Sequence, residues 1–134
     1  MTGGVRPFFE RYAAAFEAYD AAAIAACFAT PCLFVRGGQT EAAADASAVT
    51  ASVEALLDLH RGWDVGRADP AEVAVLEEGP GHAVARVGWR LGRPGTRVEW
   101  AFATTYTLVP PPAASASEPD DWRIAVAVTH DAPF

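Results

Sequence analysis

A stripe of four aromatic side chains near the start of the chain most constrains what this chain can fold into. Phe9, Tyr12, Phe16 and Tyr19 recur at intervals of three, four and three residues. This spacing places all four rings on one face of a helix, because an α-helix completes a turn every ~3.6 residues. A helix with one aromatic face must bury that face against another layer of the protein.

A second, short helix and then a strand are predicted to follow the aromatic helix. Asp20 is typical of a helix N-cap, so we expect a helix over residues 21–29 that buries Phe28. Pro31 disfavours helical geometry in the residue before it, which ends this helix. The apolar run over residues 32–35 predicts a strand. Two short helices that lead into a strand are typical of a lid over a sheet, and such lids enclose pockets.

The remainder of the sequence predicts one more helix and a run of strands. Asp45 or Ser47 can cap a helix that extends to about Arg61, where Gly62 is expected to form a left-handed C-cap. One side of that helix would carry Val49, Val53, Leu56, Leu57 and His60. Strands are predicted over residues 71–78, 82–91, 97–109 and 122–130, because apolar and polar residues alternate there between Gly- and Pro-containing turns.

Alternation along the last three strands predicts which side chains share the apolar face of a sheet. These are Ala83, Ala85, Val87, Trp89 and Leu91; Val98, Trp100, Phe102, Thr104, Tyr106 and Leu108; and Trp122, Ile124, Val126, Val128 and His130. Helices in the first half and consecutive strands afterwards predict a single α+β domain, residues 1–134, with a mostly antiparallel sheet. We expect this sheet to curve into a cone with Trp63, Trp89 and Trp100 at its mouth.

Composition excludes several classes of function. The net charge of −7 and pI near 4.8 argue against nucleic acid or an anionic membrane as partners. All ten basic residues are arginine, so lysine-based Schiff-base, pyridoxal phosphate and P-loop chemistry is excluded. Cys27 and Cys32 lack C-x-x-C spacing, and buried thiols in a reducing cytoplasm are favoured over a redox pair. The three histidines lack short-range metal-ligand spacing, so neither a metal nor a cofactor is expected.

The order of these elements resembles that of the nuclear transport factor two-like superfamily. The resemblance includes Phe9–Glu10–Arg11–Tyr12, Tyr19–Asp20, Ile24, Phe28, Pro31 and the closing Trp122–Arg123–Ile124. This superfamily shares a cone-shaped, cystatin-like α+β fold among ketosteroid isomerases, SnoaL-like polyketide cyclases and scytalone dehydratase. The resemblance implies three helices from the N-terminal half of the chain, packed on the concave face of the sheet. It also implies a homodimer formed through the outer sheet face.

Most of the ketosteroid isomerase site does not carry over to this chain. An alignment without gaps places Tyr12 where that enzyme keeps its oxyanion-hole tyrosine. Arg36 falls where the enzyme has its catalytic aspartate, and arginine cannot abstract a proton. Thr104 falls on or beside the position of its second, protonated aspartic acid. The resemblance therefore implies the fold but not this activity.

Three polar residues remain candidates for a site, and two of them have a plainer alternative. Tyr12 would donate a hydrogen bond to a ligand carbonyl, or is one more core aromatic. Arg36 would clamp a carboxylate, or is a surface arginine, or is paired with Glu41 or Glu99. His130 would act as an acid or base, whereas His60 and His82 are expected to be capping or solvated.

Two classes of function are open from the sequence. The first is a pocket that binds a hydrophobic molecule bearing a carbonyl or carboxylate. Its predicted lining is Tyr12, Phe16, Phe34, Arg36, Trp63, Trp89, Trp100, Phe102, Thr104 and His130. Turnover there would be cofactor-free isomerisation, cyclisation, dehydration or hydrolysis. The second is a non-catalytic homodimeric accessory module that pairs through Glu99, Ala101, Ala103, Thr105, Ala125 and Ala127.

Overall fold

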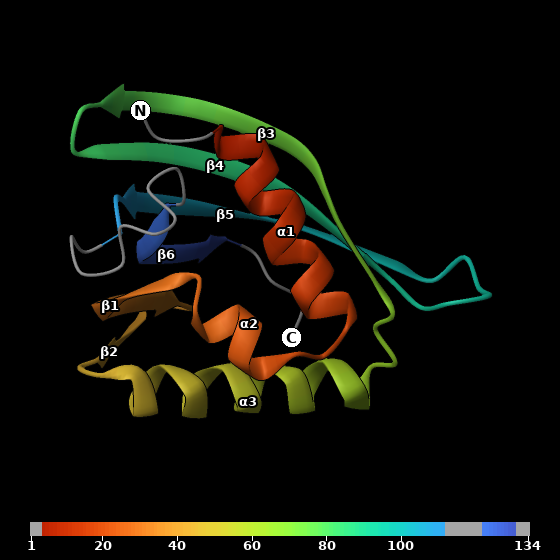
Figure 1. Cartoon of the computed structure of the whole chain (residues 1–134). Helices are drawn as coiled ribbons and strands as arrows, with labels where there is room; N and C mark the ends of the chain where they lie inside the picture. Colours follow the sequence, from red (N-terminus) through yellow and green to blue (C-terminus); the bar gives the residue numbers. More distant parts are fainter. Residues whose placement is uncertain (1–3, 112–121, 131–134) are drawn as a thin grey trace.

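Three helices pack against one six-stranded sheet in a computed structural model, which describes residues 4–111 and 122–130 (Figure 1). The helices are α1 (Val5–Glu17), α2 (Ala21–Ala25) and α3 (Ala46–Gly62). The strands are β1 (Phe28–Arg36), β2 (Gln39–Ala43), β3 (Arg67–Gly79), β4 (His82–Gly92), β5 (Glu99–Val109) and β6 (Arg123–His130). The predicted α+β class is confirmed. Within the described ranges, no helix combines the length and apolar character needed to cross a bilayer.

The sheet has the strand order β2-β1-β6-β5-β4-β3. Only the β1–β6 pair is parallel among the described strand pairs, and the others are antiparallel. The sheet curves over α1, and α3 lies below α2 and the β1–β2 hairpin (Figure 1). This curvature leaves space between the sheet and the helices, which is where a pocket can form.

The aromatic face of α1 is buried, as its spacing predicts. Phe9, Tyr12 and Phe16 are at most 8% exposed. Tyr19 lies beyond the end of the helix with a positive φ of 54°, and its hydroxyl donates a hydrogen bond to the Val65 carbonyl. The aromatic stripe thus anchors α1 to the sheet and the turn after it to the segment before β3.

Both predicted N-caps are present, but the predicted end of α2 and the predicted left-handed cap at Gly62 are wrong. Asp20 caps α2, and Asp45 accepts a hydrogen bond from the Ala48 amide at 2.9 Å at the start of α3. α2 ends at Ala25, because Phe28 already pairs with β6 as the first residue of β1. Gly62 is the last helical residue rather than a left-handed cap.

The alternation of β4 is confirmed, whereas that of β6 is interrupted. All five predicted inward residues of β4 are at most 5% exposed. In β6, Ile124 pairs with Leu108, but Val126 already pairs with Thr107, so one extra residue is inserted between them. Such a bulge reverses which side chains face inward along the rest of the strand. Ala127 therefore faces the core, contrary to the prediction that it lies on the outer face.

A candidate ligand pocket

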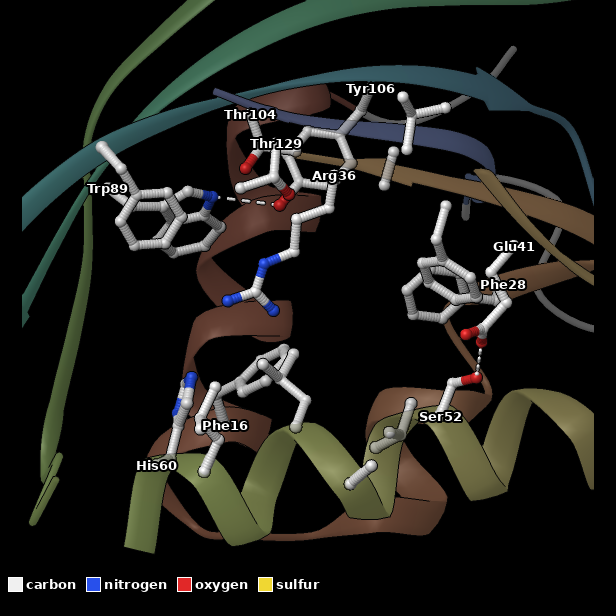
Figure 2. Close-up of a pocket in the computed structure, with 18 of the residues that line it drawn as sticks. Phe16, Phe28, Arg36, Glu41, Ser52, His60, Trp89, Thr104, Tyr106 and Thr129 are labelled. Atoms are coloured by element: carbon white, nitrogen blue, oxygen red, sulfur yellow. Dashed lines mark hydrogen bonds between the residues drawn. The ribbon is translucent and has the colours of Figure 1, made fainter. Parts of the chain in front are cut away.

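A cavity of about 790 Å³ lies between the concave face of the sheet and the helices (Figure 2). The sheet, α1, α3 and the β1–β2 hairpin all contribute to its wall. Seven aromatic residues line it, namely Tyr12, Phe16, Phe28, Phe34, Trp89, Phe102 and Tyr106. A cavity of this size, with mostly apolar walls that include several aromatic rings, is typical of a site for a small organic molecule.

Hydroxyl groups cluster on the sheet side of the cavity. The Trp89 indole donates a hydrogen bond to the Tyr106 hydroxyl at 3.0 Å, and the Thr104 and Tyr12 hydroxyls also hydrogen-bond to Tyr106. Burial raises the pKa of Tyr106 to about 12, although these hydrogen bonds oppose the rise. Burial also raises the pKa of Tyr12 well above its ordinary value. Both phenols therefore stay neutral and can donate hydrogen bonds, but neither can act as a base near pH 7.

Arg36 brings a permanent positive charge into the cavity. It is the last residue of β1, and Gly37 and Gly38 follow it with positive φ angles of 58° and 77°. This tight turn joins β1 to β2, so Arg36 stands at the very end of β1. Its guanidinium extends from the sheet toward the middle of the cavity (Figure 2). Because an arginine stays protonated, this charge persists at every accessible pH.

His60 is the most informative cavity residue that sequence reasoning did not place there. Its side chain lies near the end of α3, is 5% exposed, and has its ring centroid 5.4 Å from that of Phe16. Burial, and secondarily the positive charge of Arg36, lower the pKa of His60 to about 4. The imidazole is therefore neutral at pH 7 and held within reach of the cavity.

A polar bridge lies where the cavity borders β2 and α3. The Ser52 hydroxyl donates a hydrogen bond to the Glu41 carboxylate, and both residues line the cavity (Figure 2). Thr40 and Ala51 beside them are exposed. Glu41 therefore marks the open side of the cavity, away from the buried hydroxyl cluster. In the part of the chain that the structure describes, no three His, Cys, Asp or Glu side chains gather as a metal site would require.

Seven of the ten residues predicted to form the site lie in the cavity wall. They are Tyr12, Phe16, Phe34, Arg36, Trp89, Phe102 and Thr104. Trp63 and Trp100 do not line it, because their rings pack against each other at 5.0 Å. Arg93 lies over the Trp100 ring at 5.7 Å and donates a hydrogen bond to the Trp63 carbonyl, so the two tryptophans pack with Arg93 rather than at the mouth of the cavity.

His130 is on the opposite face of the sheet from the cavity. Its Nε2 lies 3.0 Å from the Thr105 hydroxyl, and Thr105 faces away from the helices as predicted. The extra residue in β6 causes this reversal, since without it His130 would face inward. His130 therefore cannot serve as an acid or base in this cavity.

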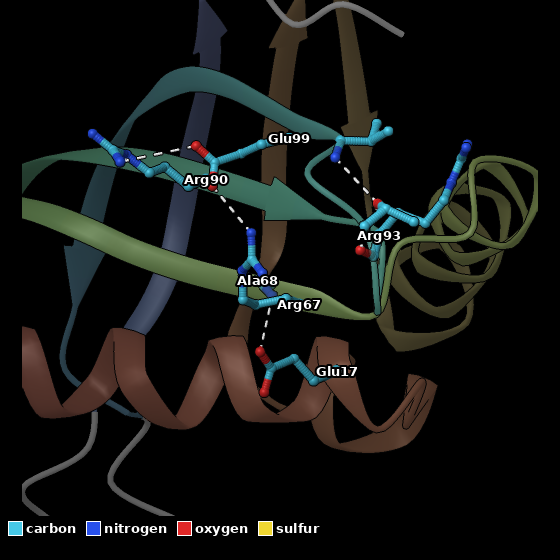
Figure 3. A network of polar contacts seen from close by, with 8 residues as sticks. Glu17, Arg67, Ala68, Arg90, Arg93 and Glu99 are labelled. Atoms are coloured by element: carbon cyan, nitrogen blue, oxygen red, sulfur yellow. Dashed lines mark hydrogen bonds and ion pairs between the residues drawn. The ribbon is translucent and has the colours of Figure 1, made fainter.

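Glu99, offered above as one partner for Arg36, takes part in a separate surface network (Figure 3). Its carboxylate accepts a hydrogen bond from Arg67 at 3.0 Å and lies 3.9 Å from Arg90. In the same region, Glu17 of α1 accepts a hydrogen bond from the Ala68 amide at 2.9 Å. These contacts tie α1 and the β4–β5 hairpin to β3 outside the cavity.

The fold is that of a cystatin-like, nuclear transport factor two-like protein. A family described as "NTF2-like protein (DUF6841)" matches residues 4–132, so the chain belongs to this family. No functionally curated protein matches the chain.

Solved structures with similar folds share little sequence with this chain. An NTF2-like protein of unknown function from Pseudomonas putida KT2440 is 21% identical with a TM-score of 0.70, covering 97% of this chain and 84% of its own. An NTF2-like protein with a cystatin-like fold from Novosphingobium aromaticivorans is 22% identical with a TM-score of 0.67, covering 93% and 77%. A domain of unknown function with this fold from Nostoc punctiforme is 16% identical with a TM-score of 0.70, covering 97% and 76%. At these identities the likeness establishes the fold alone.

Proposed function

We propose that the cavity binds a hydrophobic organic molecule that carries a carboxylate or a carbonyl group. The observation that carries this proposal is the permanent charge of Arg36, an exposed residue whose guanidinium extends into a cavity of about 790 Å³ that seven aromatic residues help to line. Aromatic walls stabilise a flat apolar body by burying its surface. The guanidinium then selects the polar end, because its fork of donors matches the two oxygens of a carboxylate.

The hydroxyl cluster offers a second polar contact for such a ligand. Tyr12, Thr104 and Tyr106 present neutral hydroxyl groups in the same cavity wall. A neutral hydroxyl in a dry site donates to a carbonyl oxygen more strongly than it does in water. A ligand with both groups would place its carboxylate at Arg36 and its carbonyl oxygen toward the hydroxyls.

A cofactor-free isomerase, cyclase, dehydratase or hydrolase would need an acid or base in this cavity. The buried phenols cannot serve as bases near neutral pH, since burial raises the pKa of each. Among the described residues of the cavity wall, His60 and Glu41 carry side chains that can accept a proton there. Ligand binding is the simpler proposal, because it needs only the charge and the apolar walls.

A thermal unfolding experiment with matched aromatic probes tests the proposal. 2-Naphthoate carries a carboxylate on a flat ring system, and 2-naphthamide has the same rings without the charge. At a hundredfold excess over its dissociation constant, a ligand stabilises the folded state by about 3 kcal/mol, on the order of 10 °C in melting temperature. We expect 2-naphthoate to raise the melting temperature and 2-naphthamide to raise it much less.

A pair of arginine variants identifies the residue responsible. Arg36→Met should abolish the difference between the two probes, because it removes the charge and keeps an apolar side chain. Arg6→Met is the matched control, since Arg6 lies on the exposed side of α1. A naphthoate effect that is unchanged in Arg36→Met, or no effect with any such acid, would exclude the proposal.

A further inference from the structure

Arg36 and His60 approach the same cavity from opposite walls. Arg36 extends from the end of β1 in the sheet, and His60 extends from the last turn of α3 (Figure 2). The Phe16 ring lies beside the imidazole, with centroids 5.4 Å apart, and restricts how the imidazole can be placed. A polar, ionisable ring is thus held in an aromatic wall opposite a permanent cation.

We propose that an anionic ligand group is held between Arg36 and His60, and that His60 takes up one proton as the anion binds. This inference rests on the proposed function and adds a second residue to the anion site. The proton comes from solvent, and no covalent bond forms or breaks. The bound state would then consist of one anion contacted by two cations, the guanidinium and the imidazolium.

The physical reason lies in the two effects that keep His60 neutral in the free protein. Burial disfavours the charged imidazole, and the positive charge of Arg36 adds to this, so the pKa of His60 falls to about 4. An anion placed between the two side chains would offset the charge of Arg36 and attract a proton to His60. Binding of the anion should therefore raise the pKa of His60.

Charged side chains on α3, α1 and β2 also pair or hydrogen-bond with neighbouring groups. On α3, Arg61 pairs with Asp58 at 2.8 Å in solvent. On α1, the Glu17 carboxylate accepts from the Ala68 amide, and on β2 the Glu41 carboxylate accepts from Ser52. Arg36 is the charged group that contributes to the shift of the His60 pKa. The ligand charge next to Arg36 is therefore the change to which the imidazole should respond.

Calorimetric titration with 2-naphthalenesulfonate tests this coupling between pH 7.5 and 5.5. A sulfonate stays charged over this range, so any pH dependence belongs to the protein rather than to the probe. If one proton is taken up, affinity should increase as pH falls, by up to about tenfold per pH unit. Titrations in buffers with different ionisation enthalpies should show uptake of up to one proton per sulfonate bound.

Two histidine variants separate His60 from other titrating groups. His60→Gln keeps a polar side chain of similar size but cannot titrate, so its affinity should vary little over the same pH range. His82→Gln is the control, because His82 lies in the β3–β4 hairpin and pairs with Glu77 on the surface. If His60→Gln does not fold, nuclear magnetic resonance of labelled histidine in the natural protein should show His60 protonated at pH 6.5 only with the sulfonate bound.

The outcomes distinguish this inference from the proposed function on which it rests. Binding that depends on Arg36 but not on pH, or a pH dependence that persists in His60→Gln, would overturn the inference and leave the proposed function intact. A His60 imidazole that stays neutral in the saturated complex at pH 5.5 would also overturn it. If neither 2-naphthoate nor 2-naphthalenesulfonate binds at any pH, both proposals are wrong.

Discussion

Replacing His60 should make the protein less sensitive to acid. The unfolded chain gains a proton on this histidine near its ordinary pKa of 6.5, whereas the folded protein gains it only near pH 4. Because the folded-state pKa is depressed, the unfolded state binds more protons between these values, and stability falls as pH decreases from about 6.5 toward 4. At about 1.4 kcal/mol per pH unit, His60 costs the folded state about 2 to 3 kcal/mol at pH 4.5 and almost nothing at pH 7.5.

Urea unfolding of the natural protein and His60→Gln at pH 7.5, 5.5 and 4.5 measures this effect. The carboxylates titrate in both proteins, so the pH dependence of the stability difference isolates His60. Relative to the natural protein, His60→Gln should gain about 2 to 3 kcal/mol between pH 7.5 and 4.5. His82→Gln should follow the natural protein, because His82 is on the surface. Parallel pH profiles for the natural protein and His60→Gln would refute the burial of a neutral imidazole.

Two further predictions concern the hydroxyl cluster and the outer sheet face. Tyr106→Phe removes the acceptor for the buried Trp89 indole, so we expect a loss of about 1 to 3 kcal/mol in urea unfolding, and an unchanged stability would contradict the hydrogen bond as described. We also expect a homodimer through the outer face, with twice the 14.1 kDa chain mass by light scattering. Ala101 lies on that face and is exposed, so Ala101→Arg should reduce the measured mass to that of the monomer. If the natural protein and the variant both have the monomer mass, the dimer is excluded.

Sequence patterns predicted those parts of the fold that are determined by local chemistry. The interval between aromatic residues predicted the buried face of α1, and Asp20 and Asp45 predicted two helix starts, because N-caps act within one turn. Strict alternation predicted the inward face of β4. No nearby residue, however, indicated that α2 would end as early as Ala25. Phe28 leaves the helix because β6, almost a hundred residues later in the chain, provides a strand for it to pair with.

The candidate site was predicted less completely, for reasons that can be traced to single residues. His130 was misplaced because Ala125–Val126–Ala127–Val128 alternates only between small and medium apolar residues, which does not reveal a bulge. The spacing of His60 after Val49, Val53 and Leu57 did indicate the buried side of α3. A histidine in the last turn can also cap its helix, and only the packing of Phe16 against it decides between these roles.

A crystal structure of the protein with bound 2-naphthoate tests the central claim most directly. We predict the carboxylate at hydrogen-bond distance from the Arg36 guanidinium, with the rings against Trp89 and the other aromatic residues of the cavity wall. Naphthoate bound elsewhere on the protein, or a cavity closed by its own side chains when the acid is present, would contradict the claim.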